Sequence, residues 1–187
     1  MLEHILELDR QVFIFLNGLG SITYDPFWLF ITRQYSWTPL FIVLLFLLYK
    51  KLGAKPTLFL VVLIALLITV SDQTANLFKY VFERLRPCNE PLLKDSIRIV
   101  KASATFGFFS AHASTSMAVS ILLFSILKPY YRYLFLIFAW PLLFGYSRIY
   151  LSMHYPGDIL AGYTMGLFLG LLFYKLYQLL ARKYFFP

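Results

Sequence analysis

Charged residues are scarce in this sequence of 187 amino acids: they make up 14% of the chain, whereas hydrophobic residues make up 60%. A soluble globular domain carries about 25% charged residues, and the mean hydropathy here is +0.70. An ordinary water-soluble domain is therefore excluded, and we expect most of the chain to be surrounded by lipid.

Features that would divide, cross-link or process the chain are also missing. A single cysteine, Cys88, excludes an internal disulfide. No Ser/Gly/Pro-rich linker is present, so residues 1–187 are expected to form one domain. The N-terminus carries acids where a secretory signal has a basic region, and no small-residue cleavage site follows. The mature chain is therefore expected to keep its N-terminus.

Long apolar runs indicate an all-α, polytopic membrane helix bundle with about five spanning helices. A helix needs about 20 mainly apolar residues to cross the hydrocarbon layer of a bilayer. Arg33 and Pro39 interrupt the first predicted span, whose upper part is expected to bend or to lie in the interface. Pro87 is expected to end the second span directly after Arg86. The predicted spans are residues 27–49, 56–86, 111–127, 133–146 and 156–180.

Residues 5–19 form a further apolar stretch, which Glu7, Asp9 and Arg10 interrupt. Such a pattern favours an amphipathic helix that lies on the membrane surface over a sixth spanning helix. The sequence contains no internal repeat, which argues against a transporter built from inverted repeats.

Charge is distributed unequally over the two sides of the predicted bundle. The linkers after the first and third spans, together with the C-terminal end, contain no acid. Their basic residues are Lys50, Lys51, Lys55, Lys128, Arg132, Lys175, Arg182 and Lys183. Short basic loops favour the cytoplasm, so the long segment 87–110 is expected to face outward. For a bacterial protein this places the segment in the periplasm, beside the inner membrane.

Ionisable residues within spanning helices are costly, so they are functional candidates by default. In the second predicted span, five polar residues follow one another at helical spacing and are expected to share a face. These are Asp72, Asn76, Lys79, Glu83 and Arg86. Interhelical hydrogen bonds and snorkelling cations are the simpler interpretation of this stripe taken alone.

Small and polar residues open the third predicted span, in the segment 109–116. Ser110 is a natural N-cap, and the unpaired amides that follow it suit an anion. His112 lies in this first turn. Taken alone, such a histidine is more often structural than catalytic.

The segment 147–158, between the fourth and fifth spans, contains Arg148, His154 and Asp158. Pro156 suits the first helical turn, and Asp158 is expected to reach back to the His154 ring and hold its tautomer. Glycines at positions 162, 166 and 170 share a face with Asp158. They predict close packing against another helix, which turns the carboxylate into the bundle.

Together these segments resemble the type 2 phosphatidic acid phosphatase superfamily over residues 56–180. The family's first motif, Lys, six residues, then Arg-Pro, matches residues 79–87. Its third motif, Ser-Arg, five residues, His, three residues, Asp, matches residues 147–158. The second motif departs from the usual Pro-Ser-Gly-His, because this chain has Phe-Ser-Ala-His at residues 109–112.

The resemblance implies a phosphatase that uses neither a metal nor another cofactor. His154 would attack phosphorus to form a phosphohistidine, Asp158 would orient it, and His112 would protonate the leaving group. The implied phosphate-binding residues are Lys79, Arg86, Ser110, Ala111 and Arg148.

The expected partners are a phosphorylated lipid, as the substrate at the outer membrane face, and membrane lipids. No nucleic acid is expected, and the oligomeric state is left open. The short chain favours undecaprenyl diphosphate. Phosphatidylglycerophosphate, phosphatidic acid, lipid A and a phosphotransferase reaction are the alternatives within the superfamily. Two hypotheses lie outside it: a zinc enzyme, against which three nearby cations argue, and a non-enzymatic anion-binding protein.

Overall fold

The computed structural model describes residues 2–184, and these residues form helices and loops without any strand. The α-helices are α1 (Leu2–Gly18), α2 (Asp25–Ile31), α3 (Thr38–Leu52), α4 (Ala54–Phe82), α5 (Ala111–Leu127), α6 (Ala139–Tyr150) and α7 (Pro156–Tyr184). Short 3-10 turns lie between them: η1 (Ile22–Tyr24), η2 (Gln34–Trp37), η3 (Pro87–Asn89), η4 (Pro91–Leu93) and η5 (Leu134–Phe138). The predicted all-α class is confirmed.

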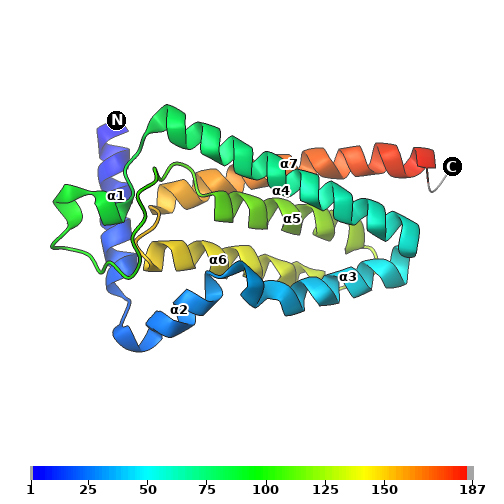
Figure 1. Ribbon diagram of the computed structural model, residues 1–187, viewed down its shortest axis with the longest axis horizontal. Coiled ribbons are helices and arrows are strands. Elements are labelled where there is room, and N and C mark those ends of the chain that lie inside the picture. The colour runs from blue at the N-terminus through cyan, green and yellow to red at the C-terminus, as the bar shows by residue number, and fades with distance from the viewer. Residues whose placement is uncertain (1, 185–187) are drawn as a thin grey trace.

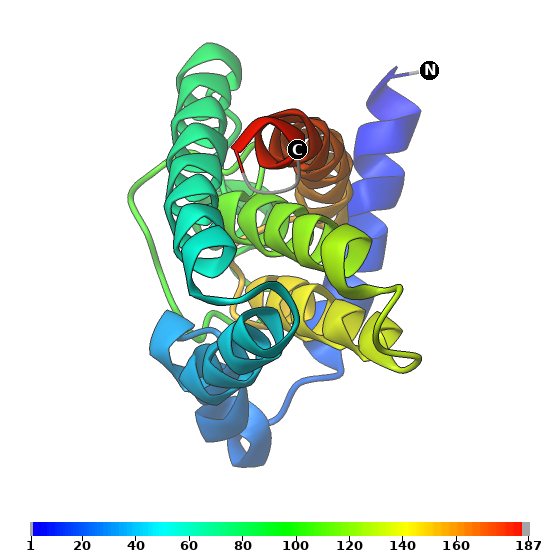
Figure 2. The same cartoon turned by 90° about the vertical axis from the view of Figure 1, so that its right-hand side faces the viewer.

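Helix α5 is the centre of the bundle, and α3, α4, α6 and α7 surround it (Figure 2). Its apolar side chains are buried on several sides, as a helix enclosed by other helices requires. Three segments are long and apolar enough to cross a membrane: Gln34–Leu52, Ala54–Leu93 and Pro156–Ala181. The shorter apolar segments Ala111–Leu127 and Leu134–Tyr150 complete a set of five.

The glycines of α7 allow it to pack closely against α5, as the sequence predicted. A Cβ atom added at Gly162 would lie 2.7 Å from the Ser110 carbonyl oxygen, and one at Gly166 would overlap the Ser114 carbonyl oxygen. Gly170 meets Ala118 in the same way, at 2.7 Å. The close contact fixes the start of α7, and with it Asp158, against the start of α5.

Helix α1 lies across one end of the bundle, roughly perpendicular to the long helices (Figure 1). Phe13 is fully buried and packs edge-on against Tyr155, with ring centroids 5.3 Å apart. Asn17 is also fully buried, and its amide nitrogen donates to the carbonyl oxygens of Arg98 and Tyr150, each at 3.1 Å. This placement agrees with the amphipathic surface helix that the charges of residues 5–19 predicted.

Several helix ends differ from the predicted ones. Helix α4 ends at Phe82 and not at Arg86, because Glu83 takes a left-handed conformation with φ of 44° and caps the helix. Glu83 and Arg86 therefore leave the predicted stripe, and only Asp72, Asn76 and Lys79 belong to it.

The first predicted span is broken into α2, η2 and α3, with the break between Arg33 and Pro39 where the sequence suggested a bend. Helix α6 extends beyond the predicted end at Tyr146, to Tyr150. The additional turn brings Arg148 into the helix.

Replacing Gly166 by Ala is expected to destabilise the protein, because the new methyl group would overlap the Ser114 carbonyl and overpacking costs about 1–3 kcal/mol. Gly18, at the end of α1, has no atom within 4 Å of an added Cβ, so Gly18→Ala is the matched control and should change stability by less than about 0.5 kcal/mol. Thermal unfolding in detergent micelles measures both. Equal stability of the two variants would contradict the close α5–α7 contact.

Candidate active site

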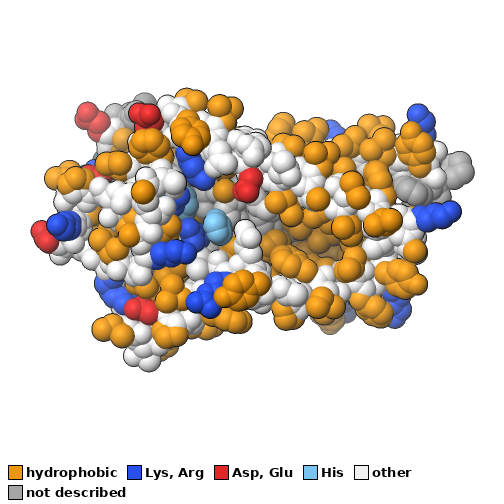
Figure 3. All heavy atoms as spheres, in the orientation of Figure 1, with side chains coloured by type: hydrophobic (Ala, Val, Ile, Leu, Met, Phe, Trp, Pro, Cys, Tyr) orange, Lys and Arg blue, Asp and Glu red, His pale blue; other side chains and the backbone are white. Residues whose placement is uncertain are grey.

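A cavity of about 610 Å³ runs through the bundle from the end that carries α1 towards its middle. One end of the cavity is polar, and Lys79, Arg86, Arg148, His112 and His154 line it. The remainder is a mainly apolar groove between α3, α4, α5 and α6. Its apolar lining residues are Trp37, Phe41, Leu44, Leu45, Leu48, Val61, Ile64, Ile68, Val119, Leu123, Trp140 and Phe144, and its polar ones are Gln34, Asp72, Asn76, Thr115 and Ser116. Figure 3 shows the hollow open on one face of the molecule, with histidine at one end and hydrophobic side chains along it.

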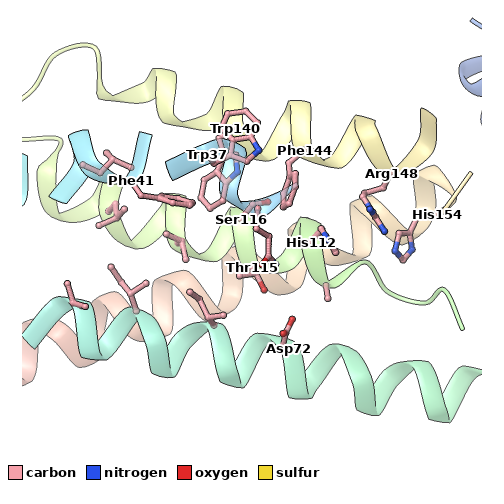
Figure 4. Close-up of a pocket in the computed structure, with 18 of the residues that line it drawn as sticks. Trp37, Phe41, Asp72, His112, Thr115, Ser116, Trp140, Phe144, Arg148 and His154 are labelled. Atoms are coloured by element: carbon pink, nitrogen blue, oxygen red, sulfur yellow. The ribbon is translucent and has the colours of Figure 1, made fainter. Parts of the chain in front are cut away.

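Residues far apart in the sequence meet at the polar end, as predicted. Lys79 comes from α4, Arg86 from the loop after it, and Arg148 from the last turn of α6. We call these three residues the cationic cup. His112, in the first turn of α5, and His154, in the loop between α6 and α7, lie beside it (Figure 4).

His154 and Asp158 form a buried pair. The ring of His154 is 2% exposed and the carboxylate of Asp158 is fully buried. The His154 Nδ1 atom lies 3.5 Å from Asp158 Oδ2, which also accepts the Tyr155 amide at 3.0 Å. The carboxylate thus faces Nδ1, and the opposite ring nitrogen, Nε2, faces Arg86.

Arg86 fixes the protonation state of His154. Its Nη1 atom lies 3.1 Å from His154 Nε2, and since a guanidinium has no acceptor, Nε2 must present its lone pair. The ring proton then resides on Nδ1, facing Asp158. Burial, followed by the positive charge of Arg86, holds the pKa of the His154 imidazole well below its ordinary value. His154 is therefore a neutral imidazole whose lone pair at Nε2 accepts the Arg86 N–H.

The guanidinium of Arg86 is itself held by the protein. Nε and Nη2 donate to the carbonyl and hydroxyl oxygens of Thr105, at 2.8 and 2.9 Å, and Nη1 donates to the Met153 carbonyl at 2.9 Å. These bonds fix the orientation of a charged side chain that is only 5% exposed. Thr105 has no motif around it, and sequence reasoning did not single it out.

Arg148 is also 5% exposed, and its guanidinium is only partly satisfied by hydrogen bonds within the protein. Its Nη1 atom donates to the hydroxyl of Thr32 at 2.7 Å, while its buried Nε atom has no hydrogen-bond partner among residues 2–184. An unpaired N–H of a buried cation is costly, and an anion is the kind of group that would satisfy it. Thr32, at the end of α2, carried no signal in the sequence.

The other predicted site residues lie close to the same end of the cavity. Lys79 donates to Asn76 Oδ1 at 3.3 Å, and Ala111 lines the cavity in the first turn of α5. His112 stacks at a tilt near Phe144, with ring centroids 5.0 Å apart. Ser110 is the N-cap of α5: its hydroxyl accepts the Ala113 amide at 3.4 Å. Ser110 is fully buried and does not line the cavity, and its contact with phosphate stays a prediction.

Comparison with known proteins places this arrangement in a family. The model of the PAP2 superfamily matches residues 55–182. A protein named lipid A 4'-phosphatase from Bacteroides thetaiotaomicron is 37% identical, over 97% of this chain and 83% of the relative. A protein named undecaprenyl-diphosphatase from Sulfolobus acidocaldarius is 27% identical, over 88% of this chain and 76% of the relative.

The fold is shared with a solved structure. The crystal structure of a PAP2 type phosphatidylglycerolphosphate phosphatase from Bacillus subtilis superimposes with a TM-score of 0.68, over 97% of this chain and 88% of that one, at 19% identity. The chain therefore belongs to the PAP2 superfamily. It is an integral membrane protein and a phosphatase of that superfamily.

Replacing Thr32 by Val should weaken the site without changing its volume. Arg148 would lose its hydroxyl acceptor, and because hydrogen bonds to charged groups are worth about 1.5–3 kcal/mol, we expect kcat/KM to fall about tenfold or more. Steady-state phosphate release from a short-chain phosphatidic acid measures this. Thr38→Val is the matched control, since the Thr38 hydroxyl is exposed and donates only to the Tyr35 carbonyl. Wild-type kinetics in Thr32→Val would contradict the role of this contact.

Proposed function

We propose that this chain hydrolyses a phosphate from lipid A through a phosphohistidine at His154. The observation that carries the proposal is the single cavity that joins a neutral, buried imidazole and the cationic cup to an apolar groove. The cup suits the oxygens of a phosphate group, and the groove suits an acyl chain that stays in the membrane. A small soluble phosphate ester would leave the groove empty.

The first step forms a bond between His154 Nε2 and phosphorus and breaks the bond from phosphorus to the leaving oxygen of the lipid. When the substrate binds, a phosphate oxygen accepts the Arg86 N–H that otherwise donates to His154 Nε2. The lone pair of Nε2 is then free to attack phosphorus. Asp158 stabilises the positive charge that develops on the ring. His112, which lines the same cavity, gives its proton to the leaving oxygen. Lys79, Arg148 and the first amides of α5 compensate the charge on the phosphoryl oxygens.

The second step returns the enzyme to its starting state. Water attacks phosphorus, the bond to Nε2 breaks, and His112 takes the proton that the water loses. Inorganic phosphate is released, and both histidines regain their original protonation. No metal is required by this scheme. Among residues 2–184, the His, Cys, Asp and Glu side chains form no group of three that would hold a metal ion.

Two observations support lipid A over the other candidate lipids. The first is the identity to a protein named lipid A 4'-phosphatase, which extends over nearly the whole chain. The second is the set of polar side chains that line the cavity beyond the cup: Gln34, Asp72 and Asn76. The acylated glucosamine of lipid A offers hydroxyl and amide groups to such side chains, whereas a polyprenyl chain offers none. Undecaprenyl diphosphate, which the sequence alone favoured, is the alternative.

Purified protein should release phosphate from lipid A faster than from undecaprenyl diphosphate, phosphatidylglycerophosphate or phosphatidic acid, with EDTA present throughout. His154→Ala should lose turnover while it unfolds at the wild-type temperature. Acid-labile label on His154 after a rapid quench with radiolabelled substrate would identify the intermediate.

Preference for undecaprenyl diphosphate would overturn the proposed substrate. Turnover in His154→Ala would overturn the mechanism. Activity that is lost with EDTA and restored by zinc would favour a metalloenzyme.

We also propose that the polar end of the cavity faces the outside of a bacterial inner membrane, with the C-terminus in the cytoplasm. The last turn of α3 carries Lys50 and Lys51 at the opposite end of the bundle. Short basic loops favour the cytoplasm, which supports this orientation. Lipid A would then be dephosphorylated in the outer leaflet.

The single cysteine allows this orientation to be tested without mutating the site. Cys88 is half-buried in η3, at the same end of the molecule as the cup. A membrane-impermeant maleimide added to spheroplasts should label Cys88 directly. A Cys88→Ser variant that carries Lys51→Cys should be labelled only after the membrane is permeabilised. The reverse pattern would show that the cup faces the cytoplasm.

A further inference from the structure

Behind the His154–Asp158 pair lies Arg84, which occupies one of the six unspecified positions of the first motif. Arg84 Nη1 donates to Asp158 Oδ1 at 2.7 Å, and Arg84 Nη2 donates to Asp9 Oδ2, also at 2.7 Å. The guanidinium therefore bridges two carboxylates, one from α7 and one from α1. Its Cζ atom lies 4.2 Å from the centroid of the Tyr155 ring, which stacks on the bridge.

We propose that Arg84 and Asp9 are positioning residues for the phosphohistidine reaction, and that they act through Asp158. This inference rests on the proposed function, because it assigns to them the orientation of the carboxylate that supports His154. Arg84 occupies Oδ1 of Asp158, so the other oxygen, Oδ2, is the one that faces His154 Nδ1. The Tyr155 amide holds that second oxygen from the other side.

Asp9 extends the same arrangement into α1. Its Oδ1 atom accepts the Gly157 amide at 2.7 Å while Oδ2 accepts Arg84. A Cβ atom at position 157 would lie 2.8 Å from Asp9 Oδ2, so this approach requires the glycine. Helix α1 is thereby fixed to the first turn of α7, the turn that also carries Asp158.

Arg84 does not belong to the cationic cup. It is absent from the lining of the cavity that holds Arg86, Arg148 and Lys79, and it lies instead on a separate depression beside Phe108 and Tyr155. The left-handed Glu83 turns the chain at the end of α4, so that Arg84 and Arg86 reach the His154–Asp158 pair from different sides. A phosphate in the cup therefore meets Arg86 and not Arg84.

The signs of the charges explain why two residues are needed. A lone Arg84 would neutralise Asp158 and reduce its attraction for the cationic ring that forms on attack. Asp9 supplies a second negative charge on the far side of Arg84, at an equal distance of 2.7 Å. Asp9, Arg84 and Asp158 together thus carry a net negative charge beside His154. Each carboxylate oxygen of Asp9 and Asp158 accepts a hydrogen bond or faces the His154 ring.

Replacing Arg84 by Lys tests this role, since Lys keeps the charge but cannot hold two carboxylates with two separate nitrogens. Misplacement of a catalytic group costs up to about 100-fold, and we expect kcat and the single-turnover rate of phosphohistidine formation to fall about 10- to 100-fold. KM should stay within about twofold of wild type. Asp9→Asn should act in the same direction, and it should lower kcat less in the Arg84→Lys background than in wild type, because the two residues act as one unit.

The chain contains a matched control for a purely structural arginine. Arg98 also pairs with a carboxylate, Asp25, at 3.0 Å, and its Cζ atom also lies over a tyrosine ring, that of Tyr150, at 5.6 Å. Arg98→Lys should lower the unfolding temperature without changing kcat. Glu7→Gln is the control for Asp9→Asn on the same helix, because Glu7 is exposed and bonds only to Gln11 and Arg10.

The outcomes separate this inference from the function on which it rests. A wild-type kcat in Arg84→Lys would overturn the positioning role. This holds whether or not the variant also unfolds at a lower temperature, as Arg98→Lys is expected to do. A raised KM at unchanged kcat would also overturn it, since Arg84 would then bind substrate. His154→Ala, measured in parallel, tests the proposed mechanism itself. Turnover in that variant would overturn both the mechanism and the positioning role of Arg84. Loss of turnover in His154→Ala, together with wild-type kinetics in Arg84→Lys, would overturn the positioning role alone.

Discussion

The site depends on keeping arginines charged and oriented within a low-dielectric bundle. A buried cation is tolerated when its N–H groups are satisfied, and the protein supplies Thr105 and Met153 to Arg86 and Thr32 to Arg148. The unpaired Nε of Arg148 leaves one buried donor without an acceptor among residues 2–184, and under the proposed function a phosphate oxygen would accept from it. The positive charge of Arg86 also helps to hold His154 neutral, so the same arginines would serve both anion binding and the proposed nucleophile.

Much of this arrangement was predictable because the chemistry requires fixed spacings. The motif residues at 79–87 and 147–158 and His112 were expected to meet, and the structure brings Lys79, Arg86, His112, Arg148 and His154 to one cavity, with Asp158 behind His154. The helix boundaries of α5 and the start of α7 also matched, since Ser110 and Pro156 are strong local signals. The roles of these residues remain proposals.

The residues that sequence reasoning missed are held by tertiary contacts alone. Thr32, Thr105 and Asp9 belong to none of the motifs, and each contacts an arginine distant in the chain. The early end of α4 was missed for another reason: Glu83 adopts a left-handed conformation that glycine usually supplies. Hydropathy and helical spacing do not report such a backbone choice.

The cavity has a polar end and an apolar groove, and under the proposed function this difference governs how the reaction would end. Inorganic phosphate is strongly hydrated and would leave by the polar end, whereas the dephosphorylated lipid would keep its acyl chains in the groove and return to the leaflet from which it came. Neither product has to pass the other, and the fatty tails are never transferred to water. For such a catalyst the quantity that sets the rate of encounter is the surface density of substrate in the membrane plane, not its concentration in solution.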